Sequence, residues 1–161
     1  LRELLLQPLP RFAVLPALER LRERLRRGRK IWRGLVHRHR LHARGYRMGV
    51  ATNKPSYFAR RLLDALGVGG LIPTVFGPDL VAHHKPHPEM VHRVLAAMDL
   101  TASEALYVGD MEVDIETARA AGVRVVVMPT GSCDLPELLA AKADLIIGGF
   151  GALLDLLPAR C

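Results

Sequence analysis

From Met48 onward, short apolar runs alternate with amphipathic stretches along the chain. This alternation is typical of βα units whose strands form a parallel sheet. The apolar runs are only a few residues long, and Val123–Met128 is rich in β-branched residues. The pattern predicts strands at Met48–Thr52, Leu71–Phe76 (a short strand or an extended loop), Ala105–Val108, Val123–Met128 and Leu145–Ile147.

The stretches between these runs carry the period of helices. In HPEMVHRVLAAM, for example, the apolar positions recur at three and four residues. Gly67 and Gly122 end two of the helices, and Asp134 with Glu137 forms a capping box at the start of another. The pattern predicts helices at Pro55–Leu66, Pro88–Met98, Glu112–Ala121, Pro136–Ala141 and Gly151–Leu157. The fold class is therefore α/β, a three-layer, Rossmann-like domain with a mainly parallel sheet.

The first forty residues follow a different pattern. Four leucines lie at helical spacing within a basic stretch, which predicts a basic amphipathic helix, and no clear period follows Gly28. Residues 1–47 carry a net charge of +11, whereas residues 48–161 carry −4. We therefore divide the chain into a basic, poorly defined segment at residues 1–40 and a core domain at residues 41–158. The leucines are Leu15, Leu18, Leu21 and Leu25.

Composition narrows the class of protein further. With 161 residues, half of them hydrophobic, the chain can form one domain with its own core. No apolar run is long enough to cross a bilayer, and Cys133 and Cys161 form no disulfide framework. We expect a cytoplasmic protein, and the start at Leu1 suggests a fragment.

Thr52-Asn53-Lys54 follows a predicted strand and leads into a helix. A hydroxyl and free backbone N–H groups at a helix N-terminus can bind a phosphate. Thr52 can equally serve as a cap of the helix. A second candidate is Lys85, which the loop prolines Pro86 and Pro88 hold just before a helix, because its ammonium can bind a phosphoryl oxygen. An isolated loop lysine can equally be a solvated charge.

The strongest chemical signal is Gly109-Asp110, followed by Asp114. A strand delivers Asp110 to the carboxyl edge of the sheet, and Asp114 lies one helical turn further on the same side. Two carboxylates in this place suit Mg²⁺. The alternative is that Asp110 caps the helix and Asp114 is a surface acid.

The segments ATNKP, KPHPE and YVGDMEVDIETARAAGV resemble, in order and spacing, three motifs of the haloacid dehalogenase-like hydrolases, and within them the phosphoglycolate phosphatases. The resemblance runs from about Leu41 to Leu157. It implies a Mg²⁺-dependent phosphatase that hydrolyses a small organic phosphomonoester through an aspartyl-phosphate. It also implies that the partner is a small phosphorylated metabolite rather than a membrane or a nucleic acid.

The resemblance assigns a role to each matching residue. Thr52 would hydrogen-bond the phosphoryl group with Asn53 and Lys54 beside it. Lys85 would neutralise the phosphoryl oxygens. Asp110 would bind Mg²⁺ directly, and Asp114 would support the ion directly or through water.

The nucleophile of this family is the first aspartate of a DxDGT-like motif at the end of the first strand. This chain has no aspartate before Asp64 and no DxD anywhere. We therefore expect the first central strand to be missing and this chain alone to be inactive. The run Phe12–Leu15 is a poor substitute, because Pro16 stands where the aspartate should be. A truncation, with or without a change of reading frame, is the simplest explanation.

Two further features have competing interpretations. The basic stretch Arg20–Lys30 fits a solvated arm better than a nucleic-acid-binding arm, because it lacks interleaved aromatic residues. Four histidines lie around the lysine motif, but their spacing matches no zinc pattern, and we expect loop histidines near a phosphate pocket. Two other functions stay open: an inactive protein that binds phosphate and Mg²⁺, and a nucleic-acid-associated protein. The histidines are His83, His84, His87 and His92.

Overall fold

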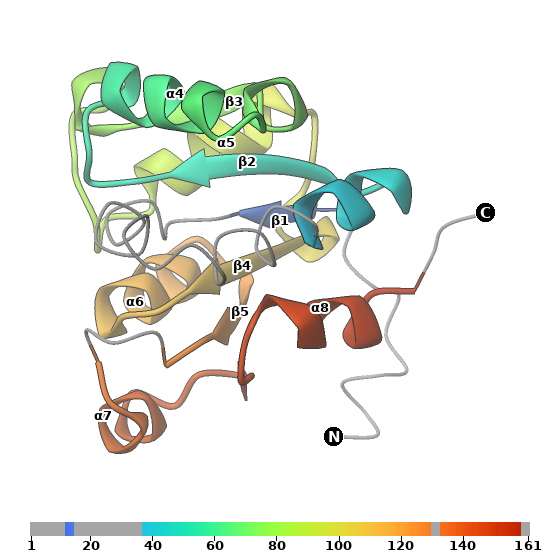
Figure 1. The fold of residues 1–161 in the computed structure, drawn as a ribbon. Helices are drawn as coiled ribbons and strands as arrows, with labels where there is room; N and C mark the ends of the chain where they lie inside the picture. The colour runs from blue at the N-terminus through green and yellow to red at the C-terminus, as the bar shows by residue number, and fades with distance from the viewer. Residues whose placement is uncertain (1–11, 15–36, 130–132, 159–161) are drawn as a thin grey trace.

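The structure is a computed structural model and describes residues 12–14, 37–129 and 133–158. Its centre is a six-stranded sheet with the order β3-β2-β1-β4-β5-β6, in which every neighbouring pair is parallel (Figure 1). The strands are β1 (Phe12–Val14), β2 (Arg47–Ala51), β3 (Thr74–Phe76), β4 (Ala105–Gly109), β5 (Arg124–Val127) and β6 (Leu145–Ile146).

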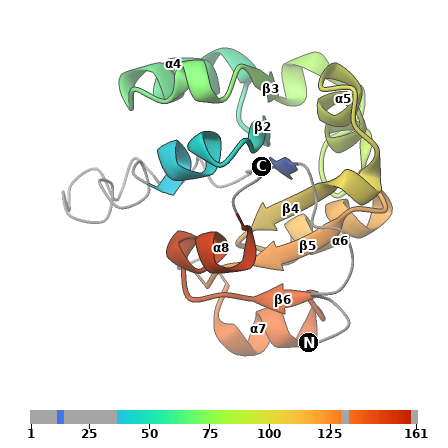
Figure 2. The same ribbon diagram turned by 90° about the vertical axis from the view of Figure 1, so that its right-hand side faces the viewer.

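Helices cover both faces of this sheet (Figure 2). One face carries α5 (Glu89–Ala97) and α6 (Glu112–Ala120), and the other carries α4 (Ser56–Ala65), the helical residues 37–43 and α8 (Phe150–Leu156). This distribution confirms the predicted α/β, three-layer fold with a parallel sheet. The remaining helices are α7 (Leu135–Ala140) and the 3₁₀ turns η2 (Gly69–Leu71), η3 (Pro78–Leu80) and η4 (Ala102–Glu104).

The apolar runs form strands that are buried in the centre of the sheet. All five residues of β4 are buried, as are four of five in β2 and three of four in β5. Strands covered on both faces need continuous apolar runs rather than alternation, and these segments supply them. α5 completes the core by burying Met90, Val91, Val94 and Leu95.

The expectation that the first central strand is missing is wrong for this structure. Phe12–Val14 forms β1 between β2 and β4: Phe12 pairs with Arg47 and Ala105, and Val14 pairs with Gly49 and Tyr107. A gap there would leave the backbone groups of two buried strands without partners. Three residues are enough to pair with both strands, and Pro16 comes after the strand rather than within it.

The predicted boundaries agree with the observed ones to within one residue for the helices from α4 to α8. Gly67 and Gly122 adopt left-handed conformations, with φ of 69° and 68°, directly after the ends of α4 and α6. This conformation favours glycine and ends a helix. The capping box of α7 is present as predicted, since Asp134 accepts from the Glu137 N–H and Glu137 accepts from the Asp134 N–H.

The end of the core domain is fastened to the start of β2. The Arg44 guanidinium donates to the backbone oxygens of Leu154 and Leu157, the latter at 2.7 Å. The Tyr46 hydroxyl donates to the Pro158 oxygen at 3.0 Å. A cation at the C-terminus of a helix satisfies its last carbonyl groups and its dipole, so these contacts hold α8 against the sheet.

The predicted basic helix and the stretch Arg20–Lys30 lie outside the described residues. β1 falls within the segment 1–40 that charge set apart from the core. Among the residues that the structure describes, no helix is long and apolar enough to cross a membrane.

Candidate phosphate and metal site

Two of the three predicted motifs follow directly after strands on either side of β1. Thr52 comes after β2, and Asp110 comes after β4. Val14 of β1 pairs with Gly49 and with Tyr107, each three residues earlier, so Thr52 and Asp110 lie at the same level of the sheet. This carboxyl edge of a parallel sheet is where α/β folds bind their ligands.

Asp114 is the centre of the hydrogen-bond network on the β4 side. It is 2% exposed, so it is not the surface acid of the alternative interpretation. Its Oδ2 accepts from the backbone N–H groups of Asp110 and Met111, at 3.0 and 3.2 Å. The carboxylate therefore reaches back over the N-terminus of α6 and accepts from the two N–H groups that immediately precede the helix.

Lys85 joins the same network from a different part of the chain. Its Nζ lies 3.0 Å from Asp114 Oδ1, and the two side chains are 5% and 3% exposed. The lysine is thus half of a buried ion pair rather than a solvated loop charge. Because the pair is desolvated, removing either charge would leave the other without compensation.

Tyr107 is a site residue that sequence reasoning missed. Its hydroxyl donates to Asp114 Oδ1 at 3.2 Å, and the Lys85 ammonium lies 5.9 Å from the centre of its ring. Complete burial, with the charges of Asp114 and Asp110 as further causes, raises the pKa of Tyr107 well above its usual range. The phenol therefore stays protonated and acts as a donor. Its hydroxyl group within an otherwise apolar buried strand was the available signal.

Gly109 is required by the close approach of Asp114. A Cβ at position 109 would lie 2.4 Å from the Asp114 Cβ and 2.8 Å from its Oδ2. No side chain fits that space without moving the start of α6. The glycine of the motif therefore makes room for the second aspartate, which is a sharper reason than the turn expected from sequence.

The β2 side is built mainly from backbone. Thr52 is 1% exposed, its N–H donates to the Phe76 oxygen at 3.0 Å, and its Oγ1 accepts from the Lys54 N–H at 3.1 Å. Lys54 is half-buried, whereas Asn53 is exposed. Thr52 is therefore fixed in place, while Asn53 is open to a ligand.

A second loop fixes the start of α4. Asp79 accepts from the Ser56 N–H at 2.6 Å and from the Ser56 hydroxyl at 2.5 Å. The pKa of Asp79 is held below its usual value, mainly by the bond from the Ser56 hydroxyl and next by the bond from the Ser56 N–H. Gly77 is close by, and a Cβ there would lie 2.5 Å from the Lys54 oxygen. Sequence reasoning missed both residues because their partners are more than twenty positions away.

The donor set of the β4 side fits Mg²⁺, the metal that the family resemblance implies. Mg²⁺ prefers one or two carboxylates and retains several waters. Asp110, 5% exposed, supplies one carboxylate. Both oxygens of Asp114 already accept two hydrogen bonds each, which favours support through water over direct ligation.

Comparison with known proteins identifies the class. The family model for haloacid dehalogenase-like hydrolases matches residues 37–128, more than half of the chain. This protein therefore belongs to the haloacid dehalogenase-like hydrolase family.

Its similar relatives include phosphoglycolate phosphatases. The enzyme of Rhodospirillum rubrum is 48% identical over 91 residues, which are 56% of this chain and 38% of the relative. That of Pectobacterium atrosepticum is 39% identical over 113 residues, 70% of this chain and 48% of the relative. The chain thus spans less than half the length of these two relatives.

Solved structures of phosphatases and of related proteins are also similar to this chain. A predicted phosphoglycolate phosphatase from Haemophilus somnus matches with a TM-score of 0.71 and 29% identity, over 76% of this chain and 55% of that one. The CbbY protein of Rhodobacter sphaeroides, solved with xylulose-(1,5)bisphosphate, matches with a TM-score of 0.65 and 26% identity. The latter match covers 76% of this chain and 55% of that one.

Proposed function

We propose that this domain forms the Mg²⁺- and phosphate-binding part of a phosphatase that hydrolyses a small organic phosphomonoester of the phosphoglycolate type. The observation that carries the proposal is the buried network of Lys85, Asp110 and Asp114 at the carboxyl edge of the sheet. The relatives named above, which include phosphoglycolate phosphatases, support the substrate class.

The β2 side would hold the phosphoryl group. The Thr52 hydroxyl would donate to a phosphoryl oxygen, from a position fixed by the bond that its Oγ1 accepts from the Lys54 N–H. Asn53, which is exposed, would donate to a phosphoryl oxygen. Lys54 would add positive charge from its half-buried position beside the same turn. The Ser56–Asp79 bonds keep this turn in one conformation, so little entropy is lost when the anion binds.

The β4 side would hold the metal and the charge that balances it. Mg²⁺ bound there would neutralise charge on the phosphoryl oxygens. Asp110 would be its direct ligand and Asp114 its support through water. Lys85 would approach the phosphoryl oxygens from its fixed position against Asp114, and Tyr107 would keep the Asp114 carboxylate oriented.

Hydrolysis in this family needs a carboxylate nucleophile at the end of the first strand. After β1, the chain continues with Leu15, Pro16 and Ala17, none of which carries a carboxylate. We infer that this chain alone binds phosphate and Mg²⁺ but does not form an aspartyl-phosphate. Turnover would require a nucleophilic carboxylate that this chain does not supply at the end of β1.

The test is to measure Mg²⁺-dependent hydrolysis of p-nitrophenyl phosphate and Mg²⁺-dependent binding of inorganic phosphate on the same preparation. The chain should bind phosphate only with Mg²⁺ and should show no turnover above that of D110N. Thr52→Val, which keeps the size of the side chain, should weaken phosphate binding.

The two outcomes that contradict the proposal are distinct. Hydrolysis that D110N abolishes would show that a nucleophile is present after all. Failure to bind phosphate in the presence of Mg²⁺, by a chain that is folded by circular dichroism, would show that the site itself is not formed.

A further inference from the structure

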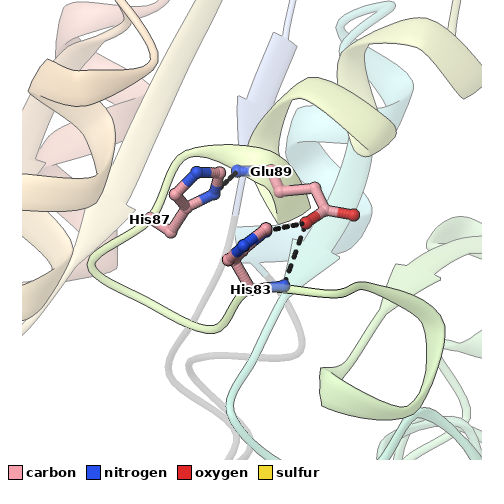
Figure 3. Close-up of side chains that lie close together, drawn as sticks. All are labelled: His83, His87 and Glu89. Atoms are coloured by element: carbon pink, nitrogen blue, oxygen red, sulfur yellow. Dashed lines mark hydrogen bonds and ion pairs between the residues drawn. The ribbon is translucent and has the colours of Figure 1, made fainter.

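Three potential metal ligands meet on the loop that carries Lys85. His83, His87 and Glu89 each offer one ligand atom, and these atoms lie within 4.8 Å of one another (Figure 3). The rings of His83 and His87 stack with their centres 4.3 Å apart, and His83 Nδ1 lies 3.0 Å from Glu89 Oε2. Lys85 stands between the two histidines in sequence, but its side chain turns to Asp114.

The loop is already folded around this group. The Glu89 carboxylate accepts from the backbone N–H groups of Ala82 and His83, at 3.1 and 2.9 Å. The N–H of Glu89 in turn donates to His87 Nδ1 at 3.2 Å. A ligand that binds here therefore meets side chains in fixed positions, and the cost of ordering them has been met on folding.

The donor set suits a particular class of ion. Two imidazoles and one carboxylate are ligands of Zn²⁺, whereas Mg²⁺ prefers oxygen alone. The side chain of His83 is 63% exposed, and an open depression of about 630 Å³ is lined by His83, His84 and His87 with their neighbours. Ions therefore have free access, and water can complete the coordination.

The rearrangement needed for binding is small. An ion between His83 Nδ1 and Glu89 would take the place of the proton between them, with bonds of about 2.0–2.2 Å to each ligand. The proton leaves to solvent from a charged imidazole, or moves through solvent to Nε2 in a neutral one, so that a neutral imidazole binds the ion in either case. Ligation by either nitrogen of His87 ends its hydrogen bond with the Glu89 N–H. At 3.2 Å this is the longest of the four bonds in the group.

We propose that His83, His87 and Glu89 form a Zn²⁺ site that is separate from the Mg²⁺ site and clamps the loop around Lys85. The ion would tie together residues on both sides of the lysine, and so hold its backbone while the ammonium contacts Asp114. Spacing along the sequence does not predict this site, because Glu89 begins α5 and the loop that carries the two histidines has no fixed period.

The test is to count Zn²⁺ bound to the full chain by equilibrium dialysis in excess Mg²⁺. The H83A/H87A variant should bind one equivalent fewer than the wild type, and E89Q should lose the same equivalent. H84A and H92A are matched controls, since both histidines are exposed neighbours outside the group, and both variants should keep it. The remaining histidines and both thiols are present in every variant, so binding there cancels in the comparison.

A second measurement guards against misfolded variants. Zn²⁺ should raise the Tm of the wild type and of H84A, but it should not raise the Tm of H83A/H87A, because only a native-state site stabilises the fold. Circular dichroism before titration confirms that each variant is folded. Unchanged stoichiometry in H83A/H87A, or an equal loss in H84A and H92A, would overturn the proposal.

Discussion

The two sides of the candidate site are built in different ways. On the β4 side, the buried side chains of Lys85 and Tyr107 both donate to the buried carboxylate of Asp114. On the β2 side, Thr52 is fixed by backbone contacts, and Asn53 is exposed. The difference teaches that one side is held rigid by charge and packing, whereas the other depends on a turn and on the loop behind it.

The largest expected effect is a difference in unfolding free energy between substitutions of Lys85, on the β4 side, and Lys54, on the β2 side. Lys85→Ala removes one partner of a buried ion pair and leaves Asp114 with an uncompensated charge, so we expect a loss of about 4 kcal/mol of unfolding free energy. Urea denaturation measures it. Lys54→Ala is the control on the β2 side, where a change within about 0.5 kcal/mol is expected. Equal losses in the two variants would erase the distinction between the sides.

The next effect comes from packing. Gly109→Ala should destabilise the domain by about 3 kcal/mol, because the new Cβ would overlap the buried Asp114 side chain. Gly70→Ala is the matched control: a Cβ there meets nothing within 4 Å. A Gly109→Ala variant as stable as Gly70→Ala would show that the start of α6 moves freely, and the rigidity assigned to this side would be wrong.

Tyr107→Phe tests one bond of the network at constant shape. It removes the donor to Asp114 Oδ1, and a loss of about 1.5 kcal/mol is expected for a bond to a charged group. The raised pKa of Tyr107 adds a pH dependence. Stability that depends on the protonated phenol is present below its unfolded-state pKa and is lost as the pH rises through the folded one. The difference in unfolding free energy between the wild type and Y107F should therefore become smaller at alkaline pH. Urea denaturation at a series of pH values measures it.

The smallest effect is expected behind the β2 side. Asp79→Ala removes the acceptor for the Ser56 N–H and hydroxyl and should cost about 1 kcal/mol, as loss of a helix cap does. The pKa of Asp79 is lowered, so its contribution is present above the unfolded-state pKa and disappears as the pH falls through the folded one. The exposed Glu116 provides a control, since Glu116→Ala should change stability little at any pH. If the difference in unfolding free energy between the wild type and D79A persisted in strong acid, the Asp79 carboxylate would not be the stabilising acceptor for Ser56.

Sequence predicted much of this molecule, and its failures have physical causes. The strands and helices after Met48 followed from apolar runs and helical periodicity, because burial on both faces of a sheet leaves a strong local pattern. β1 was not expected, since three apolar residues carry little signal without the two strands that they join. β1 forms because its backbone pairs with β2 on one side and β4 on the other.

The site shows the same division. Asp110, Asp114 and Lys85 were predicted because a short motif encodes them. Tyr107, Asp79 and the Glu89 group were missed, because their roles arise only when distant segments meet.

The most direct measurement of the central claim is a Mg²⁺ titration followed by the backbone amide resonances of Asp110 and Met111, both of which donate to Asp114. The account predicts saturable shifts of these two amides in the wild-type chain, with no such shifts in D110N. Shifts that persist unchanged in D110N, or their absence in the folded wild type, would contradict the assignment of Asp110 and Asp114 to a metal site.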